Sequence, residues 1–298
     1  MSKGIILTLD EINSTEVISI INPIPLGLLD PRSPMISPEL KKKILYEKYK
    51  KRFIADALET GHLVLKGKGV LGFISKQSVQ SFAGFVFEAY LVDKFNENWT
   101  SRLTAYQWAT ERSSGWSITN FEDYIAVGTG LLHTKTHYIN HYEPQSNADI
   151  IFIRKSPKCD VMENALVHNQ QIPAKIQVKS IKTRYKEEVI DPIRSGKYQR
   201  VITMLSDPDG ESSWKKCHTI LSNMKRNRTI TPEEHSKLIE RIQGPEFFSI
   251  SQNDVDDYYE FIFNWYNSKT KETSKYTDMA AWQEISQCKY QDGLLVPL

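Results

Sequence analysis

Two segments of the chain carry the apolar patterns of β-strands, and both bring polar side chains with them. Residues 149–154 begin with Asp149 and continue as an unbroken apolar run. Residues 174–183 instead alternate, because Ile176 and Val178 are separated and flanked by Lys and Gln residues. The stretch between the two segments is rich in Ser, Pro, Asp and Asn, which form turns. We therefore predict two antiparallel strands joined by a long connection.

Most of the remaining chain shows helical periodicity. The sequence Ser37-Pro38-Glu39 supplies a cap, a first-turn proline and a first-turn acid, and it opens a helix that we expect to reach about Gly61. One face of this helix is apolar and the others are crowded with lysines, which are either a solvated surface or contacts for phosphate. Further helices are predicted at residues 84–95, 100–116, 119–127, 213–223, from 231 onward and 253–267, a helix or loop at 186–194, and strands at 62–65 and 201–205.

The composition is that of a folded protein without a marked charge. The 298 residues are 40% hydrophobic and 25% charged, enough to bury a full core as one large domain or as one core with terminal additions. The formal charge of +2 does not by itself indicate a nucleic-acid partner, so positive residues would have to cluster. Three widely spaced cysteines suit a reducing compartment. The N-terminal apolar run is too short for a signal peptide, so we expect a cytoplasmic protein with no membrane span.

The predicted strand pair also supplies candidate chemistry. Paired in register, the strands would bring Asp149, Gln177 and Lys179 together at one end of the sheet. Carboxylate and amide oxygens are hard ligands that suit Mg²⁺. An ammonium group beside them supplies the positive charge that a phosphoryl transition state or an attacking hydroxide requires.

This combination resembles the PD-(D/E)XK nuclease superfamily, in which an Asp and a hydrophobic strand are followed by a strand of the form (Asp/Glu/Gln)-x-Lys, here Gln177-Val178-Lys179. The earlier segment Gly84-Phe85-Val86-Phe87-Glu88 is similar to a helix pattern of that superfamily, and Glu88 is the matching residue. The glutamine variant is similar to Mrr-type restriction nucleases and to some anti-phage effector nucleases. The chain departs from the family pattern because Ala148 replaces a proline and no Gly-x-Gly precedes the acid. The resemblance covers roughly residues 76–205.

The resemblance implies an α/β fold with a restriction-endonuclease-like mixed β-sheet flanked by helices, extended by helical N- and C-terminal additions. The expected divisions are an N-terminal arm with the basic helix over residues 1–75, a nuclease-like core over 76–210 and a helical C-terminal region over 211–298. The implied activity is that of a metal-dependent endonuclease that hydrolyses DNA phosphodiester bonds in restriction or phage defence.

The resemblance also assigns roles to individual residues. Mg²⁺, with Mn²⁺ as a substitute, would be held by Asp149, the Gln177 side chain and the Val178 carbonyl, with assistance from Glu88. Lys179 would lie beside the activated water.

Two other functions fit the same residues. Because Gln177 removes one anionic ligand, the chain could be a catalytically degenerate nuclease fold that binds nucleic acid or serves in an assembly. It could equally be an RNA-cutting toxin or effector, since the motifs do not distinguish DNA from RNA.

Substrate geometry adds predictions about partners. Cutting both strands of a DNA duplex favours a homodimer, and we expect its interface to involve the proline-rich residues 20–36 and the aromatic-rich helix at 253–267. Basic residues just beyond the predicted site are either solvated or contact substrate phosphates; they are Lys182, Arg184, Lys186, Arg194, Lys197 and Arg200.

Two further patterns have alternative interpretations. Residues 67–72 match the Gly-x-Gly-x-x-Gly dinucleotide fingerprint, but no acid ends a second strand at the required distance, which favours an ordinary glycine turn. His133, His137 and His141 recur every fourth residue in a segment whose threonines favour a strand. They are zinc ligands, a polar wall leading to Asp149, or ordinary histidines.

Overall fold

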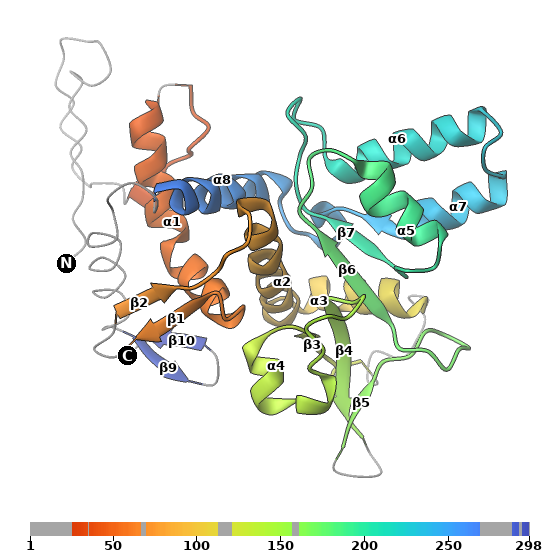
Figure 1. Cartoon of the computed structure of the whole chain (residues 1–298), viewed down its shortest axis with the longest axis horizontal. Coiled ribbons are helices and arrows are strands. Elements are labelled where there is room, and N and C mark those ends of the chain that lie inside the picture. The colour runs from red at the N-terminus through yellow and green to blue at the C-terminus, as the bar shows by residue number, and fades with distance from the viewer. Residues whose placement is uncertain are drawn as a thin grey trace.

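The computed structural model describes residues 26–34, 36–66, 70–112, 121–156, 161–268, 288–291 and 294–297. Within these residues, six strands form one mixed sheet in the order β3-β4-β6-β7-β8, with β5 paired to the outer part of β4 (Figure 1). The strands are β3 (Ile125–Gly128), β4 (Ile150–Lys155), β5 (Met162–Asn164), β6 (Lys175–Lys179), β7 (Val201–Thr203) and β8 (Ile242–Gln243). β4 is antiparallel to β3, β5 and β6, whereas β6, β7 and β8 run parallel.

Helices flank this sheet on both sides. They are α1 (Pro38–Glu59), α2 (Val79–Glu97), α3 (Trp99–Thr110), α4 (Leu132–His137), α5 (Asp191–Arg194), α6 (Ser213–Arg226), α7 (Pro232–Glu240) and α8 (Gln252–Ser268). Short 3-10 turns lie at η2 (Leu26–Leu28), η5 (Ile139–His141) and η7 (Pro245–Phe248), and a π-helical turn, η6 (Lys186–Ile190), precedes α5. Two hairpins stand apart from the sheet, β1 (Leu63–Lys66) with β2 (Val70–Phe73) and β9 (Cys288–Gln291) with β10 (Leu294–Pro297).

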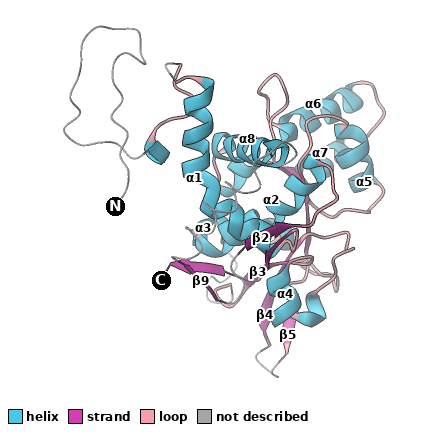
Figure 2. Ribbon diagram, turned by 60° about the vertical axis from the view of Figure 1, so that its left-hand side comes forward, coloured by secondary structure: helices cyan, strands magenta, loops and turns pink. Residues whose placement is uncertain are grey.

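The larger core lies between one face of the sheet and the helices α1, α2, α3 and α8. Ile176 and Val178 of β6 belong to the same hydrophobic cluster as Phe82 of α2 and Tyr258 of α8. Since side chains alternate along a strand, the polar residues of β6 must face the other way. On that other side, α5, α6 and α7 pack around Val201 in a second cluster, and both views place them as a separate group (Figures 1 and 2).

Helix α1 confirms the basic helix predicted from the N-terminal pattern. The Ser37 hydroxyl accepts a hydrogen bond from the Leu40 backbone N–H at 3.2 Å, and Pro38 occupies the first turn. The apolar face of α1 packs against α2 and α8, so segments from all three expected divisions of the chain share one hydrophobic cluster. Of the proline-rich arm, residues 20–25 and 35 lie outside the described residues.

The central strand pair is as predicted. Ile150 of β4 lies opposite Ile176 of β6 in an antiparallel ladder, and the strand expected at 201–205 is β7. The architecture is therefore α/β, with a mixed open sheet flanked by helices. Within the described part of the chain, no helix is long and apolar enough to span a bilayer.

The helix predicted from about residue 119 is wrong where the structure describes it. Residues 121–123 form a turn and residues 125–128 form β3, which pairs with β4 from Ile125 opposite Ile153 to Gly128 opposite Ile150. The apolar residues at 124, 125 and 127 fit the spacing of a helix or of a strand, and the segment forms a strand because it pairs with the edge of β4. The helix expected at 100–116 is α3, which ends earlier, at Thr110, with Glu111 in the left-handed conformation; residues 113–116 lie outside the described residues.

The strand favoured around the histidines is also wrong. Leu131 and Thr134 are both buried, and a spacing of three places them on one face only in a helix. The threonines' preference for strands is thus overridden by packing, and the segment forms α4 and η5. In the turned view, α4 lies beside β4 and β5 (Figure 2).

The glycine-rich segment joins strand to strand. β1 and β2 pair antiparallel with Lys66 opposite Val70, whereas a dinucleotide-binding turn leads from a strand into a helix. Residues 67–69 lie outside the described residues, but the hairpin on either side of them is consistent with the glycine turn.

Candidate functional site

Asp149 and Gln177 meet at the end of the β4–β6 ladder. Ile150 is paired with Ile176, so the residue before Ile150 lies opposite the residue after Ile176. The Gln177 side-chain amide donates to Asp149 Oδ2 at 2.5 Å, and the Val178 backbone N–H donates to the same oxygen at 2.6 Å. Asp149 is only 9% exposed. Its carboxylate therefore replaces the backbone of β4 as the partner of Val178 where the ladder ends.

Lys179 is the last residue of β6 and shares the strand face of Gln177. Its ammonium lies 3.9 Å from Glu188 Oε2 and 5.1 Å from the centre of the Tyr198 ring. Both contacts are long for the group, which has three donors. The ammonium is thus held near Asp149 without being fully hydrogen-bonded to the residues around it.

Glu88 approaches from α2, on the opposite face of the sheet. The helix is capped by Ser78, which accepts from Ser81 N at 3.2 Å. Glu88 Oε2 lies 4.0 Å from the position that a Cβ would take at Gly130, in the turn after β3. The helix thus delivers a carboxylate to the end of the sheet at which Asp149 lies.

The pKa values of Glu88 and Asp149 show that three of the predicted residues interact electrostatically. Burial raises the pKa of Glu88 well above its usual value, the negative charge of Asp149 raises it further, and Lys179 opposes both effects. Burial likewise raises the pKa of Asp149 to about 7, against the hydrogen bonds from Val178 and Gln177 and the charge of Lys179. The structure therefore brings Asp149, Gln177, Lys179 and Glu88 into one site that holds two acidic groups and one basic group, and the raised pKa values of the acids reflect this imbalance.

The oxygen atoms of this site suit a hard cation as ligands. Both hydrogen bonds to the Asp149 carboxylate end on Oδ2, and Oδ1 accepts no hydrogen bond from the described residues. The Gln177 backbone N–H donates to the Arg200 carbonyl, on the β7 side of the strand. Backbone groups of successive residues point to opposite sides of a strand, so the N–H and the carbonyl of Val178 both point to the β4 side. Asp149 Oδ1, Glu88 and the Val178 carbonyl are oxygen ligands of the kind Mg²⁺ takes.

Gln177 is the part of the expected ligand set that fits least directly. Its NH₂ group, not its oxygen, faces Asp149. To bind a cation, the amide would have to turn over and exchange this hydrogen bond for a metal contact. No group of three or more His, Cys, Asp or Glu side chains in the described ranges is placed to hold a metal ion, so the set here depends on two carboxylates supplemented by neutral oxygens.

The expected phosphate-contacting residues are largely engaged with acids or rings. Arg184 pairs with Glu188 and Arg194 with Glu234. Lys186 pairs with Asp191, while Lys182 and Lys197 lie over the rings of Tyr259 and Tyr198. Arg200 is only 7% exposed and pairs with Glu111, apart from the other five.

The histidines lie outside the Asp149 site. The rings of His133 and His137 are 4.6 Å apart on successive turns of α4, and the backbone N–H of His133 donates to Glu59. His141 follows in η5. Among the described residues, these histidines belong to no group of three side chains that could hold a metal ion, so zinc binding gains no support.

Sequence reasoning missed two residues that support the site. The Thr129 backbone N–H donates to the Asp149 carbonyl at 2.9 Å, and its hydroxyl donates to the Ala148 carbonyl. Tyr198 lies under the Lys179 ammonium. Neither carried a local signal, because Thr129 follows a strand that was predicted as a helix and Tyr198 comes from the segment before β7.

No protein-family model, no curated protein and no solved structure matches this chain.

Proposed function

We propose that the chain is a metal-dependent phosphodiesterase that cleaves DNA. The observation that carries the proposal is the pair of carboxyl groups of Asp149, which is buried, and Glu88, which is partly buried. They lie near enough for the first to raise the pKa of the second, with the charge of Lys179 opposing that effect. Such perturbed pairs are typical of functional sites. A bound divalent cation would relieve the excess negative charge, neutralise a substrate phosphate and lower the pKa of a bound water, effects worth several kcal/mol.

The chain's own residues have distinct roles in this proposal. The Val178 N–H and the Gln177 amide hold Asp149 Oδ2, which orients Oδ1. Lys179, whose nearest recorded carboxylate oxygen is 3.9 Å away, retains donors for a phosphate oxygen or an attacking hydroxide. DNA in restriction or phage defence is the substrate context that the resemblance supports.

Cleavage assays test the proposal directly. The purified protein is incubated with plasmid DNA and, separately, with total RNA, each in Mg²⁺, in Mn²⁺ and in EDTA. We expect plasmid cleavage in the metal buffers and none in EDTA. Cleavage of RNA alone would instead support the RNA-cutting effector, and cleavage that persists in EDTA would contradict a metal-dependent site.

One contact favours a second candidate, a nucleic-acid-binding protein with a degenerate nuclease site. The Gln177 amide satisfies Asp149 Oδ2 in the way a metal ion otherwise would. Fluorescence anisotropy with labelled duplex DNA separates the two functions. Tight binding without cleavage in any metal supports the binding protein, whereas metal-dependent cleavage excludes it.

A homodimer remains our proposal for the assembly, on the ground that two sites are needed to cut two strands. The aromatic helix no longer contributes to that argument, since Tyr258, Phe261 and Ile262 of α8 are buried in the chain's own core. Light scattering with and without DNA tests it, and a monomer mass in both conditions would leave strand nicking or a single-stranded substrate.

A further inference from the structure

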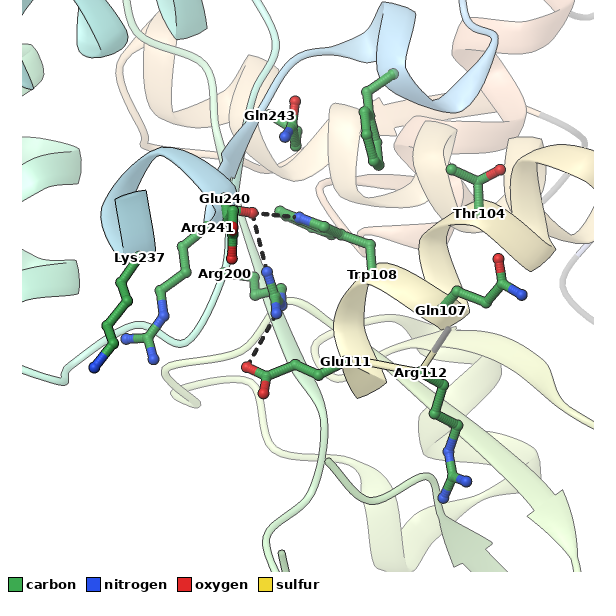
Figure 3. A pocket seen from close by; sticks show the side chains of 11 residues that line it. Thr104, Gln107, Trp108, Glu111, Arg112, Arg200, Lys237, Glu240, Arg241 and Gln243 are labelled. Atoms are coloured by element: carbon green, nitrogen blue, oxygen red, sulfur yellow. Dashed lines mark hydrogen bonds and ion pairs between the residues drawn. The ribbon is translucent and has the colours of Figure 1, made fainter. Parts of the chain in front are cut away.

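A concave site, separate from the Asp149 site, lies at the other end of the parallel strands from Lys179. Lys179 ends β6 and Arg200 immediately precedes β7, and the two strands run in the same direction. A pocket of about 660 Å³ opens there between α3, α7, β8 and η7 (Figure 3). We call it the α3–α7 pocket; its walls include Gln107, Trp108, Arg200, Lys237, Arg241 and Phe247.

One wall of the pocket is fixed by a closed hydrogen-bond network. The Trp108 indole N–H and the Arg200 guanidinium both donate to the Glu240 carbonyl, at 2.7 and 3.0 Å. The same guanidinium donates to Glu111 at 3.0 Å and lies 5.1 Å from the centre of the Trp108 ring (Figure 3). Arg200 thus joins three segments, the end of α3, the end of α7 and the residue before β7, and the wall is preformed.

The remaining charges of the pocket are mainly positive. Lys237 and Arg241 line it, and neither forms one of the ion pairs recorded among the described residues. The acids on its walls are Glu240 and Glu111, and Glu111 is already paired with Arg200. An anion therefore meets two cations, neither of which forms an ion pair among the described residues, although Lys237 lies near enough to the exposed Glu233 to lower its pKa.

The pocket also offers an aromatic surface and neutral hydrogen-bonding groups. Phe247 is 45% exposed, and its ring centre lies 6.2 Å from that of Trp108. Gln107 of α3 and Gln243 of β8 add two side-chain amides, each with donors and an acceptor. An exposed phenyl ring would stack on a planar ligand, and the amides can bond its polar edge.

We propose that the α3–α7 pocket binds a nucleotide, with the base against Phe247, its edge toward Gln107 and Gln243, and the phosphate toward Lys237 and Arg241. Pockets for small ligands commonly enclose about 300–1,000 Å³, a range that contains this pocket. The nucleotide is either a free one or the terminal nucleotide of a nucleic-acid chain. This pocket is separate from the cleavage site, because its lining does not include Asp149, Glu88 or Lys179. Its proposed role requires only binding.

Calorimetric titration tests the pocket with nucleoside monophosphates, inorganic phosphate, and short single-stranded DNA with and without a terminal phosphate. We expect saturable binding of nucleotides, weakened about tenfold by Arg241→Gln and by Phe247→Ala, as expected for loss of a phosphate contact or a stacked base. Matched controls are Arg226→Gln on α6 and Phe263→Ala on α8, where the phenylalanine is 40% exposed but does not line the pocket. Both controls should bind as the wild type does.

The probes distinguish the two sources of the ligand. Binding of monophosphates that short DNA cannot displace indicates a free nucleotide, whereas stronger binding of the terminally phosphorylated strand indicates a chain end. The proposal is overturned if no nucleotide probe binds, if inorganic phosphate binds as tightly as a nucleotide, or if both pocket variants bind normally. In a Lys179→Ala background, Arg241→Gln and Phe247→Ala should still weaken nucleotide binding about tenfold, so loss of cleavage and loss of nucleotide binding can be separated.

Discussion

Two parts of the molecule bury acidic side chains, and they differ in how those charges are matched. Between α1 and α8, Asp56 is 1% exposed, and Arg52 holds it at 2.9 and 3.0 Å while the Tyr258 hydroxyl donates to it at 2.7 Å. At the end of the sheet, Asp149 has two neutral donors, and a second, partly buried acid, Glu88, lies near the same cation, Lys179.

The comparison shows that a buried acid does not by itself mark a functional site. Asp56 meets a cation within hydrogen-bond distance, which is the usual condition for burying a charge in a stable core, although Arg52 also pairs with the more exposed Asp93 and Glu97. The ammonium of Lys179 makes no such bond with Asp149 or Glu88 in the described structure, so that site retains an unmet need for positive charge. Incomplete compensation, more than burial, is what points to a ligand.

The largest expected effect is the loss of cleavage on removing the site's charges. Asp149→Asn and Lys179→Ala should each reduce the metal-dependent rate by about 10²–10⁴, because each removes an interaction worth several kcal/mol in the transition state. Asp149→Asn should unfold at the same temperature as the wild type or higher, since the amide still accepts from Val178 and no longer repels Glu88. Plasmid cleavage and thermal unfolding measure the two effects.

Lys175→Ala is the matched control for the lysine variant. Lys175 stands on the same face of β6, at the other end of the strand. It should cleave at nearly the wild-type rate. A Lys179→Ala protein that cleaves as fast as Lys175→Ala would show that the site is assigned to the wrong residues.

The converse effect, a loss of stability without a loss of cleavage, is expected for the Arg52–Asp56 pair. Arg52→Met should lower the free energy of unfolding by about 3–5 kcal/mol, because it leaves Asp56 buried without its cation. The folded fraction should still cleave normally at low temperature. Urea unfolding provides the measurement, and Lys51→Met on the exposed side of α1 is the control, with an expected change of about 0.5 kcal/mol or less. An equally small change for Arg52→Met would mean that the ion pair does not stabilise the core.

A pH dependence of intermediate size in the free energy of unfolding is expected from Glu59, a buried acid that lies outside both the Arg52–Asp56 pair and the Asp149 site. One of its oxygens accepts from the His133 N–H and the other has no recorded partner. Burial raises the pKa of Glu59 to about 7. The folded state therefore prefers the protonated acid, and the stability it contributes is full below the unfolded pKa of about 4.3 and is lost as the pH rises to about 7.

Glu59→Gln should remove this part of the pH dependence. The wild type should lose up to about 1.4 kcal/mol per pH unit relative to the variant over that window. Urea unfolding of both proteins between pH 5 and pH 8 measures the difference. If the two proteins differ by the same amount at both pH values, Glu59 is ionised in the folded state throughout.

The smallest expected effect sharpens the role of Gln177. Gln177→Glu replaces a neutral ligand by a charged one, so we expect cleavage to be retained with a metal requirement about tenfold lower, equivalent to about 1.4 kcal/mol. A titration of cleavage against Mg²⁺ measures it. Complete loss of cleavage in a folded variant would mean that the site needs the hydrogen bond from the Gln177 NH₂ to Asp149, and the ligand role would be withdrawn.

The local pattern of the sequence determined the elements that carry the cleavage site. Alternation in β6 places Ile176 and Val178 on one face and Gln177 and Lys179 on the other, whatever the rest of the chain does. The same pattern predicted the antiparallel partner that begins at Asp149. These predictions succeed because the spacing of side chains along a strand is a property of the backbone itself.

Only the tertiary structure decided where strands and helices were equally compatible with the residues. β3 forms because the edge of β4 is open to it, and α4 forms because Leu131 and Thr134 are buried together. Arg200 appeared to continue the basic surface, but Glu111 and Trp108 of α3 enclose it.

The matching of buried charge was likewise decided only by the fold. Asp56 reads as one polar residue of a lysine-rich helix, yet its hydroxyl donor, Tyr258, comes from the far end of the chain. The α3–α7 pocket joins residues from Thr104 to Phe247 in the same way. Burial and compensation of a charge depend on partners that are distant in sequence, and the residues around each acid carry no local record of them.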